Sequence, residues 1–183
     1  MSDQSDLQPW LRRRANENLR RLSPSERETM LIRGWMSHDA RWFMAVAAES
    51  GMAVANRLNR IAAREIGKVE AQRLVRALQL PPVTTLGDYL LTQEILVAFL
   101  GPDLIDYGIF QGSDHVYQMR VRRCFAYDNA GRAGIADDYE CGIFARVTGW
   151  FEALGLAHEM NPSLGKCLKA QGQECIHTFT LGH

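Results

Sequence analysis

The pattern of apolar residues changes at Gly101-Pro102, and this change constrains the fold more than any other feature. Before it, over residues 23–80 and 84–100, apolar residues recur at the spacing of amphipathic helices. Breaks in the first of these stretches are predicted near residues 37–39, at Gly51 and at Gly67. After it, over residues 107–125, apolar and polar residues alternate, as they do in a strand with one buried face. This order predicts an α+β fold, in which a helical half is followed by a small antiparallel sheet that carries one long helix.

Two segments have the form of a helix start. Ser23-Pro24-Ser25-Glu26 combines an N-cap serine, a proline at the first helical position and a glutamate two residues later. Asp137-Asp138-Tyr139-Glu140 has a similar form and predicts a helix to about residue 154, with Cys141 near its fourth position. The partial positive charge at that helix start would favour the Cys141 thiolate.

The same signals suggest how the chain is divided. Residues 1–22 are predicted to form a basic amphipathic helix, and residues 23–183 a single α+β domain. Within that domain, residues 23–101 form the helical part, and residues 102–183 form the sheet part that bears the cysteines.

The composition is that of an ordinary globular protein. Of 183 residues, 46% are hydrophobic and 23% charged, and 21 basic residues balance 21 acidic ones. A chain with no net charge is not typical of a general nucleic-acid or membrane-surface binder. Its first residues are not those of a signal peptide, and no apolar run approaches the ~18 residues of a membrane span. We therefore expect a soluble, cytoplasmic protein that binds neither nucleic acid nor membrane.

All four cysteines lie in the last third of the chain, at Cys124, Cys141, Cys167 and Cys175. A reducing compartment keeps such thiols free, so structural disulfides are not expected. Three explanations remain: a shared metal centre, either zinc or an iron–sulfur cluster; catalytic thiol chemistry; and inert, loosely clustered thiols. The cysteines are separated by 16, 25 and 7 residues and form no Cys-x2-Cys motif, so their spacing does not choose among the three.

Strand periodicity predicts which way these thiols face. Residues 107–110 and 115–125 form a predicted hairpin, whose second strand places Tyr117, Met119, Val121 and Phe125 on one face and Gln118, Arg120, Arg122 and Cys124 on the other. Residues 128–131 are predicted to form a turn or loop. A second hairpin is predicted over residues 166–181, folded at Gly172. With a three-residue loop, Cys167 lies opposite Cys175, and His177 shares the face of Cys175. Each cysteine then lies at or near the end of an element, which favours convergence on one point.

A second group of residues could form a polar pocket. His38 and Trp42 lie one turn apart, and Asn56 and Asn59 follow on the next predicted helix. His38 could act as a general base or ligand, and the asparagines as orienting donors. Arg122 could bind a substrate carboxylate with two hydrogen bonds. A satisfied histidine between helices and an arginine on an exposed strand face are the simpler explanations.

The last third of the chain also resembles known families. The resemblance is carried by Arg122-Arg123-Cys124, Glu140-Cys141, Gly149-Trp150-Phe151-Glu152-Ala153-Leu154, Lys166-Cys167 and Gly172-x2-Cys175-x3-Phe179. This ending resembles that of the vinyl-reductase-type (4-vinyl reductase) ligand-binding domains. It also resembles the uncharacterised cysteine-containing families grouped with L-2-amino-thiazoline-4-carboxylate hydrolase. Residues 35–43, Trp-Met-Ser-His-Asp-Ala-Arg-Trp-Phe, are similar to an N-terminal motif of the hydrolase-like group.

The resemblance implies a fold and a kind of site. The fold would be the α+β fold of NO-signalling haem domains and Golgi-transport vesicle-tethering subunits, which encloses a small-molecule pocket. The resemblance also implies that the cysteines bind a metal. Relatives on such a fold differ in function, so it does not by itself imply hydrolysis.

Three functional hypotheses follow. The first is a soluble small-molecule-binding protein in which all four cysteines hold zinc or an iron–sulfur cluster. The second is a hydrolase of a small heterocyclic, thiazoline-like acid, with Cys141 as nucleophile and His38 or His177 as base; its substrate-binding residues would be Arg122, Trp42 and Asn56. The third is a structural or partner-binding module with inert thiols, which docks through the N-terminal helix. A homodimer is left open.

Overall fold

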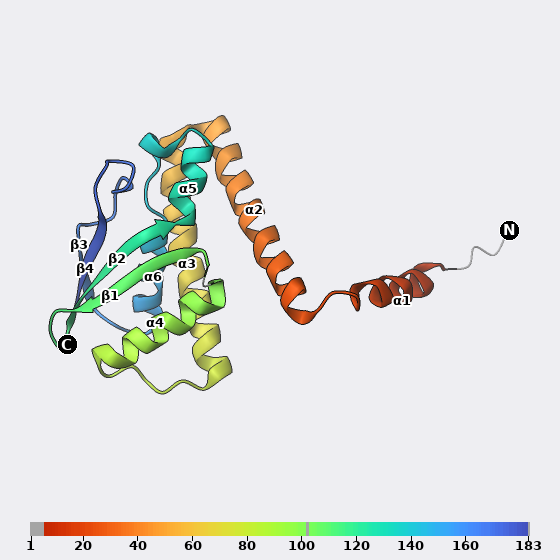
Figure 1. The fold of residues 1–183 in the computed structure, drawn as a ribbon, viewed down its shortest axis with the longest axis horizontal. Coiled ribbons are helices and arrows are strands. Elements are labelled where there is room, and N and C mark those ends of the chain that lie inside the picture. The colour runs from red at the N-terminus through yellow and green to blue at the C-terminus, as the bar shows by residue number, and fades with distance from the viewer. Residues whose placement is uncertain (1–5, 102, 183) are drawn as a thin grey trace. The chain divides into compact units, whose positions relative to one another are not determined.

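The computed structural model describes residues 6–101 and 103–182 (Figure 1). The chain divides into two compact units, Met1–Arg41 and Trp42–His183. The boundary expected after residue 22 stays a prediction. The first unit contains α1 (Gln8–Leu19) and the beginning of α2 (Pro24–Ser50). Every residue of these two helices is at least partly exposed.

Local hydrogen bonds fix the helix starts that the sequence predicts. Ser23 Oγ accepts a hydrogen bond from the N–H of Glu26 at 3.2 Å, and the Glu26 carboxylate accepts one from the N–H of Ser23 at 2.8 Å. This reciprocal pair is a capping box, and it confirms the predicted start of α2. Helix α4 (Leu86–Leu100) begins with the same arrangement, made by Thr85 and Asp88.

Helix α3 (Met52–Leu78) follows α2 after a single break. Gly51 has φ = 84°, a conformation that glycine adopts without strain, and it confirms one of three predicted breaks. The chain stays helical through the other two, near residues 37–39 and at Gly67. Gly67 has another role, because a Cβ at this position would lie 2.3 Å from the Arg146 carbonyl oxygen of α6 (Ile143–Ala153). It therefore allows two helix backbones to approach closely.

Gly149 serves the same crossing from α6. A Cβ on Gly149 would lie 2.1 Å from the carbonyl oxygen of Arg64 in α3. Beside the crossing, the buried Glu70 carboxylate accepts hydrogen bonds from Arg146 Nε at 2.6 Å and from Trp150 Nε1 at 2.7 Å. Close packing and a satisfied buried charge together fix α6, the helix that follows Cys141.

The second unit contains a four-stranded antiparallel sheet in the order β1-β2-β4-β3. Its strands are β1 (Ile105–Gln111), β2 (Val116–Cys124), β3 (His158–Asn161) and β4 (Cys175–Leu181). The predicted β1–β2 hairpin is confirmed, and β2 also pairs with β4 along six residues. Because β2 and β4 run in opposite directions, the end of one lies beside the start of the other (Figure 1).

One hydrophobic core joins this sheet to α3, α4 and α6. Tyr117 of β2 and Phe179 of β4 stack with ring centroids 4.9 Å apart. Tyr89 of α4 stacks on Phe151 of α6 at 4.3 Å. The predicted α+β fold, with its helical N-terminal half, is confirmed. Among the helices that the structure describes, none is long and apolar enough to cross a membrane.

Candidate metal centre

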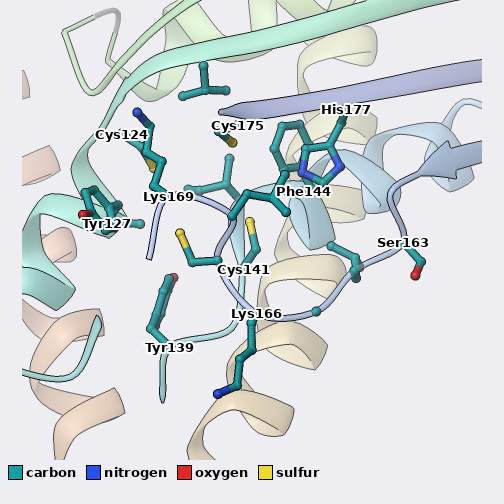
Figure 2. A pocket seen from close by; sticks show the side chains of 17 residues that line it. Cys124, Tyr127, Tyr139, Cys141, Phe144, Ser163, Lys166, Lys169, Cys175 and His177 are labelled. Carbon is teal, nitrogen blue, oxygen red and sulfur yellow. The ribbon is translucent and has the colours of Figure 1, made fainter. Parts of the chain in front are cut away.

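All four cysteines line one small cavity. Cys124 ends β2, Cys175 begins β4, Cys141 lies just before α6, and Cys167 lies in the loop that leads to β4. Figure 2 shows Cys124, Cys141 and Cys175 around this space. The cavity has a volume of about 30 Å³. Four segments of the chain therefore meet at one interior space.

A β-bulge turns Cys124 toward this cavity. The register of β1 and β2 skips Arg122, because its neighbours Val121 and Arg123 face consecutive residues of β1. After the extra residue, Cys124 lies on the same face as Val121, and both line the cavity. The prediction that Cys124 shares a face with Arg122 is therefore wrong. The extra residue shifts the two-residue period by one.

The predicted position of Cys141 inside a helix is also wrong. Ala136–Asp138 form a single 3₁₀ turn, residues 139–141 are extended, and α6 begins only at Ile143. Cys141 therefore precedes the helix. The physical reason is that residues 139–141 pair with a distant segment, and this tertiary pairing overrides the local preference for a helix.

That pairing holds two of the cysteines. The N–H of Cys141 donates to the Gly165 carbonyl at 3.0 Å, and the N–H of Cys167 donates to the Tyr139 carbonyl at 3.0 Å. These residues flank a single antiparallel bridge between Glu140 and Lys166. Side chains on either side of a bridging pair point to the same face, so Cys141 and Cys167 face the cavity together.

Asn56 of α3 holds the same extended segment from its other edge. Its Nδ2 donates to the Asp138 carbonyl at 2.7 Å, and its Oδ1 accepts from the N–H of Glu140 at 3.0 Å. Asn56 is only 2% exposed. Asn56, which the hydrolase hypothesis assigns to substrate, therefore uses both polar groups of its side chain to bind the backbone just before Cys141.

The predicted hairpin between Cys167 and Cys175 does not form. β4 pairs with β2 and β3 instead, and residues 168–173 form a turn in which the N–H of Gln173 donates to the Leu168 carbonyl at 2.9 Å. Gly172 does adopt the expected left-handed conformation, with φ = 71°. β4 instead forms its backbone hydrogen bonds with β2 on one side and with β3 on the other. The two cysteines reach the cavity on separate segments.

The thiols are close enough to affect one another's ionisation. Burial raises the pKa of Cys141 to about 12, and charge on Cys124 or Cys175 adds to this effect. Burial likewise raises the pKa of Cys175 to about 12, with contributions from charge on Cys124 and Cys167. Burial also raises the pKa of Cys124. As free thiols, these three groups are protonated at neutral pH.

Backbone N–H groups oppose this effect at two of the sulfurs. The N–H groups of Phe144 and Ile143, at the start of α6, lower the pKa of Cys141, although burial outweighs them. Cys124 is the residue that precedes α5 (Phe125–Arg132), a helix formed where a loop was predicted. The nearby N–H groups of Tyr127 and Ala126 lower its pKa in the same way. Two of the four sulfurs thus lie at helix starts, where negative charge is favoured.

His177 lies in the cavity wall as a packed, neutral ring. It is 4% exposed, and its ring centroid lies 3.9 Å from that of Phe144. Nδ1 lies 3.1 Å from the Pro162 carbonyl oxygen, which can only accept, so Nδ1 carries the proton. Burial lowers the pKa of His177. The ring is therefore neutral at neutral pH.

Two lysines in the cavity wall were not anticipated from the sequence. Lys166 and Lys169 both line the cavity. Lys169 Nζ donates to the Arg122 carbonyl at 2.7 Å, which ties the loop of Cys167 to the bulge, and Lys166 Nζ donates to the Asp137 carbonyl at 3.3 Å. In the described part of the chain, neither ammonium group forms a salt bridge. Their closeness in sequence to Cys167 was the available signal.

The remaining predicted residues do not join this wall. Arg122 Nε donates to both carboxylate oxygens of Asp106 at 3.0 Å, so its guanidinium is engaged at the surface. Trp42 is 66% exposed on α2. His38 is exposed on the part of α2 that belongs to the first unit. Of the residues named for hydrolysis, the cavity wall contains Cys141 and His177.

The side chains present fit a thiophilic metal. Cysteine sulfur is the ligand that zinc and iron–sulfur clusters prefer, and the described lining contains no carboxylate that would suit magnesium or calcium. Within residues 6–101 and 103–182, no three His, Cys, Asp or Glu side chains are already arranged around one ion position. The fit therefore lies in the ligand type and in the convergence of the four segments.

Comparison with known proteins identifies a family without assigning an activity. Residues 26–179, most of the chain, match a family of unknown function, DUF6125. No curated protein and no solved structure matches the chain.

Proposed function

We propose a metal-binding function for this chain, which belongs to that family of unknown function: its four cysteines together hold a zinc ion or an iron–sulfur cluster. The observation that carries the proposal is the convergence of four thiols, each from a different segment, on one cavity. The chain has no other cysteine. Free cysteines can also pack in a core as small apolar side chains, but ligands of one metal centre must converge in this way.

Charge at the site supports the same proposal. A bound cation would keep the four sulfurs as thiolates, which burial alone disfavours. Four thiolates around a dication leave a net negative charge, and the ammonium group of Lys169, whose charge lowers the pKa of Cys175, would offset it. The N–H groups at the starts of α5 and α6 would act in the same direction at Cys124 and Cys141.

The small-molecule ligand implied by the resemblance stays a prediction. Ligand pockets commonly enclose roughly 300–1,000 Å³, whereas the space between the cysteines is about 30 Å³. Hydrolysis by a free Cys141 thiolate is not proposed. Its thiol is protonated at neutral pH, and the Arg122 guanidinium is occupied by Asp106.

Metal content tests the proposal directly. The protein is purified without oxygen, and metals are measured per chain together with the thiols that react with a chromogenic disulfide reagent. Because all four cysteines belong to the site, thiol titration has no background from elsewhere in the chain. We expect a stoichiometric metal centre, thiols protected in the native state, and loss of metal in Cys141→Ser but not in Ser163→Ala, which changes another residue of the wall. Metal-free native protein with four reactive thiols would refute the proposal.

A further inference from the structure

The space between the cysteines is larger than a single zinc ion requires. In a zinc site made by four cysteines, each sulfur lies about 2.3 Å from the metal. Sulfurs at that distance pack against one another and leave no room for water. Here the cavity that the four cysteines line has a volume of about 30 Å³. Such a space suits a group of several atoms.

The walls of this cavity are fixed by separate parts of the fold. Cys175 is held in the β2–β4 ladder, opposite Val121. Cys124 follows the bulge that Lys169 ties to the neighbouring loop. Cys141 follows the segment clamped by Asn56. Among the described residues, no three of these side chains already surround one ion position, so a single ion would have to draw together sulfurs held by the sheet, the extended segment and the loop.

The spacing of the ligands excludes the usual short motifs of both kinds of centre. Structural zinc sites commonly draw two cysteines from one short Cys-x2–4-Cys turn, and many iron–sulfur proteins also use Cys-x2-Cys spacing. This chain has no such turn, because 16, 25 and 7 residues separate its cysteines. Each ligand comes instead from its own segment, and together they surround an interior space rather than forming a knuckle at the surface.

The surroundings of the cavity suit a sulfur-rich group. Its wall includes the apolar side chains of Val121, Ile143, Phe144, Leu164 and Leu168. Backbone N–H groups at two helix starts lie near Cys124 and Cys141. Apolar burial and N–H groups directed at sulfur are the features by which proteins hold and tune iron–sulfur clusters.

We infer that the metal centre is an iron–sulfur cluster ligated by Cys124, Cys141, Cys167 and Cys175, and not a single zinc ion. This inference rests on the proposed metal-binding function, which it makes more specific. It concerns the identity of the bound group and assigns no reaction to it.

The test uses the full chain, purified without oxygen. Iron, zinc and acid-labile sulfide are measured per chain, and the visible spectrum is recorded before and after incubation with ferrous iron, sulfide and a thiol reductant. We expect iron and sulfide in similar amounts, with a broad visible band that dithionite bleaches. The band should be lost in each of the four single Cys→Ser variants and kept in Ser163→Ala. A parallel titration with zinc alone provides the competing case.

The outcomes separate this inference from the proposal beneath it. One zinc per chain without sulfide, and no visible band after reconstitution, would overturn the iron–sulfur inference and leave the metal-binding function standing. A chain that takes up neither zinc nor iron would overturn both. Because a Cys→Ser variant can fail to fold, its circular dichroism is compared with that of the parent. Alkylation of the four thiols in the parent chain provides a second route, and it should prevent cluster assembly.

Discussion

Replacing Asn56 by alanine tests how the extended segment before Cys141 is held. The side chain is 2% exposed, and both of its polar ends bond to backbone groups, the Asp138 carbonyl and the Glu140 N–H. Neither group takes part in the hydrogen bonds of the bridge on the other edge, which use the Cys141 N–H and the Tyr139 carbonyl. The truncation therefore leaves two buried backbone groups without their side-chain partner.

The cost can be worked from those two hydrogen bonds. A buried polar group left unsatisfied costs about 1–3 kcal/mol. Two such groups, less some relief from water entering the vacated space, give an expected loss of about 2–4 kcal/mol in the free energy of unfolding. Asn56→Asp should also destabilise, because it keeps an acceptor for Glu140 but turns a carboxylate oxygen toward the Asp138 carbonyl. The matched control is Asn18→Ala, an exposed residue of α1 that donates to the Arg14 carbonyl, for which we expect a change within about 0.5 kcal/mol.

Two assays read this prediction. Urea unfolding followed by circular dichroism gives the loss of stability. The rate at which native, metal-free protein reacts with a thiol reagent reports on residues 139–141, and we expect it to rise in Asn56→Ala and to stay unchanged in Asn18→Ala. An unfolding free energy for Asn56→Ala within about 0.5 kcal/mol of the parent would show that the clamp has little energetic weight.

Three further changes test other parts of the fold. Gly149→Ala places a Cβ 2.1 Å from the Arg64 carbonyl oxygen and should cost about 2–3 kcal/mol by overpacking; Gly131→Ala, which meets nothing within 4 Å, should not destabilise in the same urea assay. Burial lowers the pKa of His158, which stacks on Phe151, so the unfolded state takes up a proton first and stability falls as pH drops from about 7 to about 5. His158→Phe should reduce that dependence and leave the part due to His177, whose pKa burial also lowers; an unchanged slope would contradict the assignment. Lys169→Met removes both a wall charge and the bond to the bulge and should speed metal loss to a chelator, whereas Lys169→Arg should retain more of the parent behaviour; equal rates in Lys169→Met and the parent would contradict this role.

The parts of the fold predicted from the sequence are those set by local patterns. The capping box at Ser23, the break at Gly51 and the β1–β2 hairpin each depend on a few neighbouring residues, and all three are confirmed. The same local reasoning predicted a helix break at Gly67, where α3 in fact continues. At Gly67, packing against α6 decides the outcome, because a glycine in a helix allows another backbone to approach as well as weakening the helix.

Two of the site errors, at Cys141 and at the Cys167–Cys175 hairpin, come from pairing between distant segments. Residues 139–141 leave the helical pattern because residues 165–167 and Asn56 supply their hydrogen bonds. Neither segment contains a local sequence signal that predicts this pairing. The bulge at Arg122 did leave a trace, since two consecutive charged residues, Arg122 and Arg123, interrupt the alternation of β2. A stricter use of the two-residue period would have found it.

The four cysteines converge although two of the local arguments for that convergence were wrong. Antiparallel pairing puts the end of β2 beside the start of β4. Cys124 and Cys175 therefore lie at the same end of these two central strands, whatever the conformation of the loop between Cys167 and Cys175. The bridge between residues 140 and 166 then brings Cys141 and Cys167 to a common face. Each pair is joined by backbone hydrogen bonds that require no metal. A centre bound there would therefore link two pairs of ligands that the fold has already placed, and would be expected to stabilise the contact between the sheet edge and the 139–141 segment more than either pairing alone.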